Sequence, residues 1–493
     1  MREKTYVKEN YGLYIDGQWR AASDGGVFKV TCPADNSQLS ICAEATQEDV
    51  DAAVAAAWQA FGEWRKISPA QRAAILNQIA DRIEANAAHM AMVESLDSGK
   101  PIAQTLSGDI PEAIEHFRYF AGVIQGEEGN ATMLSEDMLS IILREPIGVV
   151  GQIVPWNFPF SIGAWKIAPA LAAGCCIVFK PSSSTSLSVL EFARLVEDIL
   201  PPGVFNVITG SGSRSGEYML HHPGIRKLSF TGSTEIGRHV ALVAAERLIP
   251  ATLELGGKSA NIFFADCNWE KALDGLMMGI LYNQGQVCCA GSRIFVQDSI
   301  YDRFLADATK KFEAVKVGMP WDESALLGPL VYEGHLQDVL RYVEIGVGEG
   351  ARLLCGGKRL CEGDFAKGCF MRPTILADAR NDMRIAQEEI FGPVATVIRF
   401  HTEEEVIELA NQSPYGLGGG VWTQDINRAL RVARAVETGR MWVNNYGACP
   451  AGAPFGGYKE SGIGRETHKM TLAHYSQVKN IMISLSETPE GYF

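Results

Sequence analysis

Val149-Val150-Gly151-Gln152-Ile153-Val154 is a short apolar run that stands directly before Pro155-Trp156-Asn157-Phe158-Pro159. Windows with helical spacing separate it from four similar runs, at Cys176 to Phe179, Val204 to Ile208, Lys227 to Phe230 and Ala251 to Leu255. Short, continuous apolar strands that alternate with helices are typical of a parallel sheet covered on both faces. From about Gly148 the sequence therefore predicts an α/β fold of the architecture that binds nucleotides at the carboxyl ends of its strands.

A second α/β region is expected from about Gly256 to Gly457. It contains strand-like segments at Ser292 to Val296 and at Val394 to Phe400, and a helical window at Asp425 to Val436. No tandem repeat or low-complexity linker separates it from the first region.

Amphipathic helices are predicted ahead of these regions. One covers Thr46 to Phe61, with Thr46 as its N-cap, and another opens at Ser68-Pro69. The most hydrophobic stretch of the chain, Ile162 to Phe179, is interrupted by Lys166 and Pro169. We interpret it as a buried helix followed by a buried strand, and not as a helix that spans a membrane.

Two short β-prone stretches, Met138 to Arg144 and Gln477 to Ile483, fit neither region. An exposed strand is a sheet edge that can pair with another strand. Pairing with another subunit and pairing within the chain are both open at this point.

Composition excludes several classes of protein. The chain has 493 residues, 47% of them hydrophobic and 21% charged, so it has enough apolar surface for two to four folding units and is not intrinsically disordered. Its formal net charge of -14 and the lack of a long Lys/Arg run argue against a nucleic-acid binder. We expect a protein that acts on a small molecule.

The amino terminus shows neither an apolar signal segment nor an Arg-rich transit peptide, which favours the cytoplasm. Eleven cysteines stand in irregular positions, and the adjacent pairs Cys175/Cys176 and Cys288/Cys289 cannot easily form ordinary disulfides. Reduced thiols are therefore expected. The nine histidines form no HExxH or similarly spaced pair, so no metal site is predicted.

Three residues and one turn are candidates for chemistry, and each also has an ordinary interpretation. Cys288, in a turn of small residues, is either a nucleophile or a small buried hydrophobe. Glu254, at the end of a strand, is either a general base or an ion-pair partner of Lys258. Asn157 is either an oxyanion donor or a turn residue. The segment Thr231 to Gly237 either binds phosphate at a helix N-terminus or packs a strand tightly on a helix.

Together these segments resemble the aldehyde dehydrogenase superfamily over essentially the whole chain. The motifs that carry the resemblance stand in family order: Pro155-Trp156-Asn157-Phe158-Pro159, Lys180-Pro181, Phe230-Thr231-Gly232-Ser233, Leu253-Glu254-Leu255-Gly256-Gly257-Lys258, Gly285-Gln286-Val287-Cys288, Glu388-Glu389-Ile390-Phe391-Gly392-Pro393 and Pro454-Phe455-Gly456-Gly457. The resemblance implies a Rossmann-like cofactor domain at residues 1–123 and 147–255 and an α/β catalytic domain at 256–457. It also implies a small β element for oligomerisation at 124–146 and 475–493, and hence a homodimer or homotetramer.

The same resemblance implies a covalent mechanism. Cys288 attacks the aldehyde carbonyl, the Asn157 amide and the Cys288 backbone N–H hold the oxyanion, and Glu254 activates water to hydrolyse the resulting thioester. Lys166 and Glu466 match positions proposed to relay protons from the base, although either can equally be an ordinary ion-pair member.

For the cofactor, the resemblance implies NAD. The residues expected around it are Ile153, Trp156, Lys180, Ser183, Gly232, Ser233, Leu255, Glu389 and Phe391. Ser183 stands where most NAD-preferring relatives have a glutamate that repels a 2′-phosphate, so the sequence also leaves room for NADP.

The substrate tunnel implied by the resemblance is almost wholly apolar or aromatic. Its expected lining is Phe158, Ile162, Trp165, Tyr282, Val287, Cys289, Cys449 and Phe455. None of these residues can pair with a carboxylate, so we expect an uncharged aliphatic or aromatic aldehyde. Two rivals remain: a CoA-acylating or semialdehyde dehydrogenase, which Glu254 argues against, and a non-catalytic protein of the same fold.

Overall fold

The computed structural model describes residues 6–492, so the outermost parts of the expected domains, residues 1–5 and 493, lie outside the described residues. Its first sheet has eight strands in the order β22-β12-β11-β8-β9-β10-β2-β3. Five of these strands run parallel: β8 (Val149–Ile153), β9 (Cys176–Lys180), β10 (Phe205–Val207), β11 (Lys227–Thr231) and β12 (Ala251–Glu254). They confirm the five strands that the apolar runs predict. The antiparallel additions are β2 (Leu13–Ile15), β3 (Gln18–Arg20) and β22 (Gly462–Ile463).

The order of these strands creates a switch point between β8 and β11. From β8 the chain first adds β9 and β10 on one side, and later adds β11 and β12 on the other. In open α/β sheets, ligands bind outside the carboxyl ends of the strands at such a point. We therefore expect a nucleotide to bind at the segments that follow Ile153 and Thr231.

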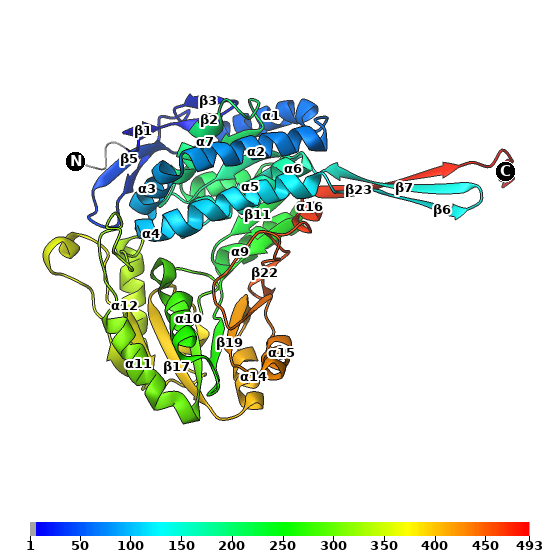
Figure 1. Ribbon diagram of the computed structural model, residues 1–493. Helices are drawn as coiled ribbons and strands as arrows, with labels where there is room; N and C mark the ends of the chain where they lie inside the picture. The colour runs from blue at the N-terminus through cyan, green and yellow to red at the C-terminus, as the bar shows by residue number, and fades with distance from the viewer. Residues whose placement is uncertain (1–5, 493) are drawn as a thin grey trace.

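Helices cover this sheet, and Figure 1 shows α2 and α5 lying side by side across it. The helices of this part are α1 (Gln47–Trp64), α2 (Pro69–Ala85), α3 (Ala87–Ser98), α4 (Ile102–Gln104), α5 (Ile110–Ile124), α6 (Pro159–Ala173), α7 (Leu187–Val196), α8 (Glu217–His221) and α9 (Thr234–Glu246), with π-helical turns η2 (Thr105–Asp109) and η3 (Gly212–Gly216). Both predicted helix starts are confirmed: Thr46 and Ser68 each form a capping box with the third helical residue, and Pro69 opens α2.

The hydrophobic stretch from Ile162 to Phe179 also folds as predicted. It forms most of α6, which ends at Gly174 in a left-handed conformation, and nearly all of β9, whose five residues are buried. Within residues 6–492, no helix combines the length and the apolar character needed to cross a bilayer.

The second sheet has seven strands in the order β15-β16-β17-β14-β13-β19-β20. Its strands are β13 (Ala260–Phe263), β14 (Arg293–Gln297), β16 (Thr374–Ala377), β17 (Val394–Phe400), β19 (Gly418–Trp422) and β20 (Arg440–Val443), all parallel, with β15 (Arg352–Cys355) antiparallel at one edge. The helical segments of this part are α10 (Trp269–Leu281), α11 (Tyr301–Glu313), α12 (Glu333–Gly348), α13 (Arg384–Gln387), α14 (Glu403–Asn411), α15 (Ile426–Ala435), η4 (Tyr282–Gly285), η5 (Asp298–Ile300) and η6 (Gly363–Lys367), while α16 (Thr471–His474) packs near α6. The strands predicted near residues 292–296 and 394–400 and the helix near 425–436 are confirmed as β14, β17 and α15.

The two β-prone stretches that fit neither α/β region, Met138 to Arg144 and Gln477 to Ile483, pair with each other. β7 (Met138–Pro146) and β23 (Ser476–Ser484) are antiparallel from Met138–Ser484 to Pro146–Ser476, and β6 (Asn130–Ser135) adds a third strand beside β7. Figure 1 shows this sheet projecting far from the rest of the molecule. Pairing within the chain is thus confirmed, and β6 and β23 remain as edges.

Two small sheets complete the fold. One joins β1 (Asn10–Tyr11), β5 (Gln38–Ala43) and β4 (Val27–Thr31), and the other pairs β18 (Tyr415–Gly416) with β21 (Tyr458–Lys459).

Candidate active site

Cys288 lies in the loop between η4 and β14, and two cavities meet at its side chain. The loop is held close to the end of β12. A Cβ atom at Gly257 would lie 2.3 Å from the Cys288 carbonyl oxygen, so only glycine allows this approach. Ile162 of α6 is the other described residue that borders both cavities.

The larger cavity, of about 440 Å³, contains all the residues predicted for the substrate tunnel. They are Phe158, Ile162, Trp165, Tyr282, Val287, Cys289, Cys449 and Phe455. Aromatic pairs build its walls, with Trp165 and Phe455 ring centroids 5.3 Å apart and Phe158 stacked on Tyr282 at 6.2 Å. This cavity is deep enough and apolar enough to receive the body of a small organic molecule.

The smaller cavity, of about 220 Å³, lies at the switch point of the first sheet. Six of the residues predicted around the cofactor line it, namely Trp156, Gly232, Ser233, Leu255, Glu389 and Phe391. The Thr231 hydroxyl at the end of β11 is buried without a hydrogen-bond partner, and Ser233 caps the N-terminus of α9. An unsatisfied hydroxyl beside a helix N-terminus suits a phosphate group, so these residues fit a dinucleotide.

Sequence reasoning missed His335 in this cavity. Its imidazole Nε2 donates to the Phe391 carbonyl at 2.8 Å, and its ring centroid lies 5.1 Å from that of Trp156. Burial lowers the pKa of His335 to about 4, so the ring is neutral. Because His335 enters from α12, far along the chain, no local pattern could have identified it.

Three predicted cofactor residues lie at the same sheet edge but outside the lining of this cavity. Ile153 and Lys180 are register partners at the ends of β8 and β9, and Ser183 is half-buried in the following loop. Burial lowers the pKa of Lys180 to about 8, while the charge of Glu44 acts in the opposite direction.

Asn157 is more than a turn residue. Its side-chain amide is buried and donates to the Gln286 carbonyl at 2.8 Å, two residues before Cys288. The Asn283 amide in turn donates to the Asn157 backbone carbonyl at 2.8 Å. These bonds fix the Asn157 amide beside the Cys288 loop, and its role as an oxyanion donor stays a prediction.

Glu254 is buried at the end of β12, and neither carboxylate oxygen has a hydrogen-bond partner. Burial, reinforced by the negative charge of Glu466, raises the pKa of Glu254 well above its ordinary value. The alternative of a Glu254–Lys258 ion pair is wrong, because the buried Lys258 ammonium has no bonding partner and burial lowers its pKa to about 7.

Lys166 and Glu466 form a buried ion pair behind Glu254. The Lys166 Nζ lies 2.5 Å from Glu466 Oε1 and donates to Ser229 Oγ at 3.2 Å. The ion-pair interpretation is thus confirmed, and the relay stays a prediction. Both charges nevertheless act on the carboxyl group of Glu254: the charge of Glu466 raises its pKa and that of Lys166 lowers it.

The surroundings of the Cys288 side chain favour its protonated thiol form. A hydrogen bond with Cys289, followed by burial and the nearby carboxylates, raises the pKa of Cys288 well above its ordinary value. The adjacent cysteines Cys288 and Cys289 are free thiols, as are Cys175 and Cys176. Attack by Cys288 therefore requires a base to take the thiol proton.

A family model described as the aldehyde dehydrogenase family matches residues 19–481. The chain belongs to this family. Acetaldehyde dehydrogenase 2 of Cupriavidus necator is 47% identical over 99% of this chain and 97% of its own length. A putative aldehyde dehydrogenase from Burkholderia cenocepacia has a TM-score of 0.97 at 40% identity, covering 98% of this chain and 99% of its own. The NAD+ complex of an aldehyde dehydrogenase from Bacillus cereus has a TM-score of 0.96 at 42% identity, with the same coverage.

The larger cavity of this aldehyde dehydrogenase also contains two carboxyl groups that sequence reasoning missed. Glu112 and Glu115, on the first turns of α5, line its wall. The Trp165 indole donates to Glu112 Oε1 at 3.2 Å. The lining predicted from the sequence, which is almost wholly apolar or aromatic, is therefore incomplete, because the cavity also carries two acidic groups.

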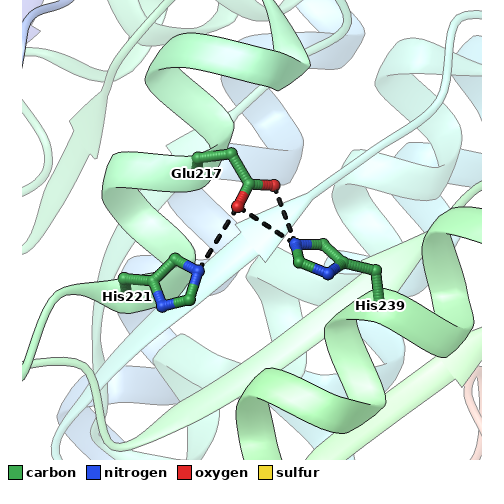
Figure 2. A group of neighbouring side chains, drawn as sticks. All are labelled: Glu217, His221 and His239. Carbon is green, nitrogen blue, oxygen red and sulfur yellow. Dashed lines mark hydrogen bonds and ion pairs between the residues drawn. The ribbon is translucent and has the colours of Figure 1, made fainter.

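A further group of side chains lies outside both cavities (Figure 2). Glu217 of α8 pairs with His221 at 3.3 Å and with His239 of α9 at 3.0 Å. Spacing along the sequence could not show that these two histidines meet, because His239 joins from another helix. The group is partly exposed and ties α8 to α9.

Proposed function

We propose that this protein oxidises an aldehyde to the carboxylic acid with NAD, through a covalent intermediate on Cys288. The observation that carries the proposal is the position of the Cys288 thiol where an apolar cavity meets the cavity at the sheet switch point. A nucleophile at this junction reaches a substrate from one side and a nicotinamide from the other. The family membership gives the same reaction class.

In the first half of the reaction, the Cys288 thiol loses its proton to solvent water, and the sulfur attacks the carbonyl carbon to give a thiohemiacetal. The Asn157 side chain and the Cys288 backbone N–H donate to the oxygen as it becomes negative. NAD supplies the electron acceptor for the oxidation. The carbonyl group then re-forms as a thioester on Cys288.

In the second half, water must displace the sulfur. Glu254 is the base for this step: its carboxylate is buried and has no hydrogen-bond partner, and its charge acts on Cys288. Its raised pKa makes it a stronger base once ionised. Glu466 and Lys166 set the charge around Glu254 and offer a path for the proton that it collects.

The cofactor assignment rests on the cavity at the switch point and on the NAD+ complex of the Bacillus cereus relative. Glu389 accepts from the Gly257 backbone N–H at 3.0 Å, and a Cβ at Gly256 would lie 2.5 Å from its other oxygen. We assign Glu389 and Phe391 to the nicotinamide ribose and Ile153 and Lys180 to the adenosine. Ser183 adds no negative charge beside Lys180, so this position does not repel the 2′-phosphate of NADP, although it creates no affinity for it either.

The lining of the larger cavity excludes aldehydes that carry a carboxylate. Among the described residues that border it, none is Lys, Arg or His. A buried carboxylate without a partner is costly, and Glu112 and Glu115 would repel it further. The substrate therefore has an apolar body, aliphatic or aromatic, and no negative charge.

We assign residues 1–123 and 147–255 to cofactor binding and residues 256–457, which contain Cys288, to catalysis. The element assigned to 124–146 and 475–493, which contains β6, β7 and β23, is proposed to join subunits of a homodimer or homotetramer. Its outer strand β23 is exposed, with Val478 62% and Met482 52% accessible. The free thiols Cys175 and Cys176 fit the reducing cytoplasm.

The test compares Cys288→Ala with Cys361→Ala, which changes an exposed cysteine outside both cavities. Formation of reduced nicotinamide is measured with NAD or NADP across short, medium-chain, aromatic and carboxylated aldehydes, with and without CoA. We expect Cys288→Ala to lose all activity, Cys361→Ala to keep it, and CoA to have no effect. Activity in Cys288→Ala would refute the mechanism, and an obligatory CoA would identify an acylating enzyme.

A further inference from the structure

Three side chains of the types that bind metals meet between α8 and α9, and Figure 2 shows them converging. Glu217 and His221 stand four residues apart on α8, so they lie on the same face of that helix. His239 reaches them from α9, which packs against α8. None of the three lines either of the two cavities that meet at Cys288, so the group needs an explanation of its own.

The distances within this group are close to those of a zinc site. His221 Nε2 lies 3.3 Å from Glu217 Oε2, and His239 Nε2 lies 3.0 Å from each of the two Glu217 oxygens. One ligand atom of each residue lies within 4.8 Å of the other two. Zinc forms bonds of about 2.0–2.2 Å to imidazole and carboxylate, so two ligand atoms of a tetrahedral site stand about 3.3–3.6 Å apart. Small side-chain rotations are enough to reach that geometry.

The charge of the group also favours a bound cation. Among residues 6–492, Glu217 forms ion pairs only with the two histidines and has no Lys or Arg partner. Neutral imidazoles offer a carboxylate hydrogen bonds but no charge. A divalent cation between the three side chains supplies that charge, and each ring binds it through a nitrogen that has released its proton.

The ligand set indicates which class of metal fits. Two imidazoles and one carboxylate suit zinc and the neighbouring transition metals, whereas Ca²⁺ and Mg²⁺ prefer oxygen ligands throughout. Three protein ligands leave one tetrahedral position for water. Solvent can reach that position here, because the side chains of Glu217, His221 and His239 are 36%, 54% and 42% exposed.

We propose that Glu217, His221 and His239 form a zinc site that joins α8 to α9. The site stands apart from the proposed aldehyde oxidation, and its ion is structural. It fixes two helices that both begin beside the expected cofactor site. A Cβ at Gly216, directly before α8, would lie 3.7 Å from Lys180 Cε, and Ser233, the N-cap of α9, lines the smaller cavity.

The experiment titrates the metal-free, full-length protein with Zn²⁺ alone and measures the zinc that stays bound after gel filtration. The wild type is compared with His221→Gln, with His239→Gln, and with His401→Gln, which changes an exposed histidine outside the group. Zinc held by thiols is common to all four proteins and cancels in the comparison. Amide hydrogen exchange of α8 and α9, with and without one equivalent of zinc, gives a second and local measurement.

We expect the wild type and His401→Gln to bind one more zinc ion than His221→Gln or His239→Gln. Losing a residue that only supports a metal ligand typically weakens binding about 10–100-fold, so losing a ligand itself should weaken it by more. Zinc should slow exchange in α8 and α9 of the wild type and of His401→Gln only. Equal exchange of the four proteins elsewhere in the chain, measured without zinc, shows that the variants are folded.

Two results would overturn the zinc site. If all four proteins bind the same amount of zinc with the same affinity, the ion is held by thiols or not at all. If one of His221→Gln and His239→Gln keeps the zinc and its effect on exchange, the metal does not join the two helices. Either result leaves the proposed aldehyde oxidation intact, since none of the three residues takes part in it.

Discussion

Replacing Glu254 by Gln should make the protein slower and more stable at the same time. Both carboxylate oxygens of Glu254 are buried without a hydrogen-bond partner, so Gln breaks no bond and has nearly the same shape. The substitution removes only the ability to ionise. Its two consequences, on turnover and on the free energy of unfolding, have opposite signs.

The effect on turnover follows from the role of Glu254 as a base. A general base contributes roughly 10²–10⁴-fold to a rate, and we expect a loss in this range. Below its raised pKa, the ionised fraction of Glu254 grows about tenfold for each pH unit, and the wild-type rate should rise accordingly. Glu254→Gln should lose this rise.

The effect on stability follows from the same raised pKa. Between the ordinary pKa of 4.5 and the raised value, the folded protein holds a proton on Glu254 that the unfolded chain has released. The free energy of unfolding therefore falls as pH rises through this window, by about 1.4 kcal/mol per pH unit. Gln removes this fall, so the variant gains stability over the wild type by about that amount with each unit.

The assay combines steady-state formation of reduced nicotinamide with urea unfolding of both proteins at pH values from about 5.5 to about 7.5. A burst of one equivalent of reduced cofactor in Glu254→Gln, followed by slow turnover, would show that hydrolysis is the impaired step. Parallel pH–rate profiles of the two proteins would refute the role of Glu254 as the general base. A variant that is less stable than the wild type at every pH would refute the raised pKa of Glu254 in the folded protein.

Three further outcomes are expected. Asn157→Ala should lower kcat about 10²–10³-fold in the same assay, because one oxyanion donor is lost, and an undiminished kcat would exclude that role. Glu466→Gln should shift the acidic limb of the pH–rate profile to lower pH, because it removes the negative charge that raises the pKa of Glu254. The same variant should lower the free energy of unfolding in urea by about 3–5 kcal/mol, because it leaves the buried Lys166 without its partner. Gly275→Ala should cost about 1–3 kcal/mol in the same unfolding measurement, since its Cβ would lie 1.9 Å from the Trp422 ring; a stability equal to that of the wild type would show that the ring can move.

Patterns within short segments predicted much of the fold. The parallel strands of the first sheet are buried on both faces, so their apolar runs are continuous and easily recognised. Thr46 and Ser68 mark helix starts because their side chains bond to the backbone three residues ahead.

Other elements carry no such signal. β19 contains Gly418, Gly419 and Gly420, which have no side chains to form an apolar run. They are needed because the strand packs closely against other residues: a Cβ at Gly420 would lie 2.6 Å from the Tyr446 ring. β6 was missed for a different reason, since all of its residues are exposed.

The functional site was likewise predicted only in part from the sequence. Motif residues such as Cys288 and Asn157 were placed from the sequence, and the structure brings their segments together. Glu112 and His335 were not, because their roles depend on where α5 and α12 lie relative to the two cavities. The π-helical turn η2 directly before α5 shifts the phase of that helix, and local spacing does not reveal such a shift.

Among the described residues, only Cys288 and Ile162 border both cavities, and this has a consequence for how the protein can evolve. Changes on α5 or in the loop at 446–450 alter the room for the aldehyde and touch no wall of the cofactor cavity. Mutations can therefore explore new aldehydes one at a time while the redox partner is kept. A scaffold divided in this way is readily diversified, in nature or by directed selection, because improving one specificity does not require repairing the other.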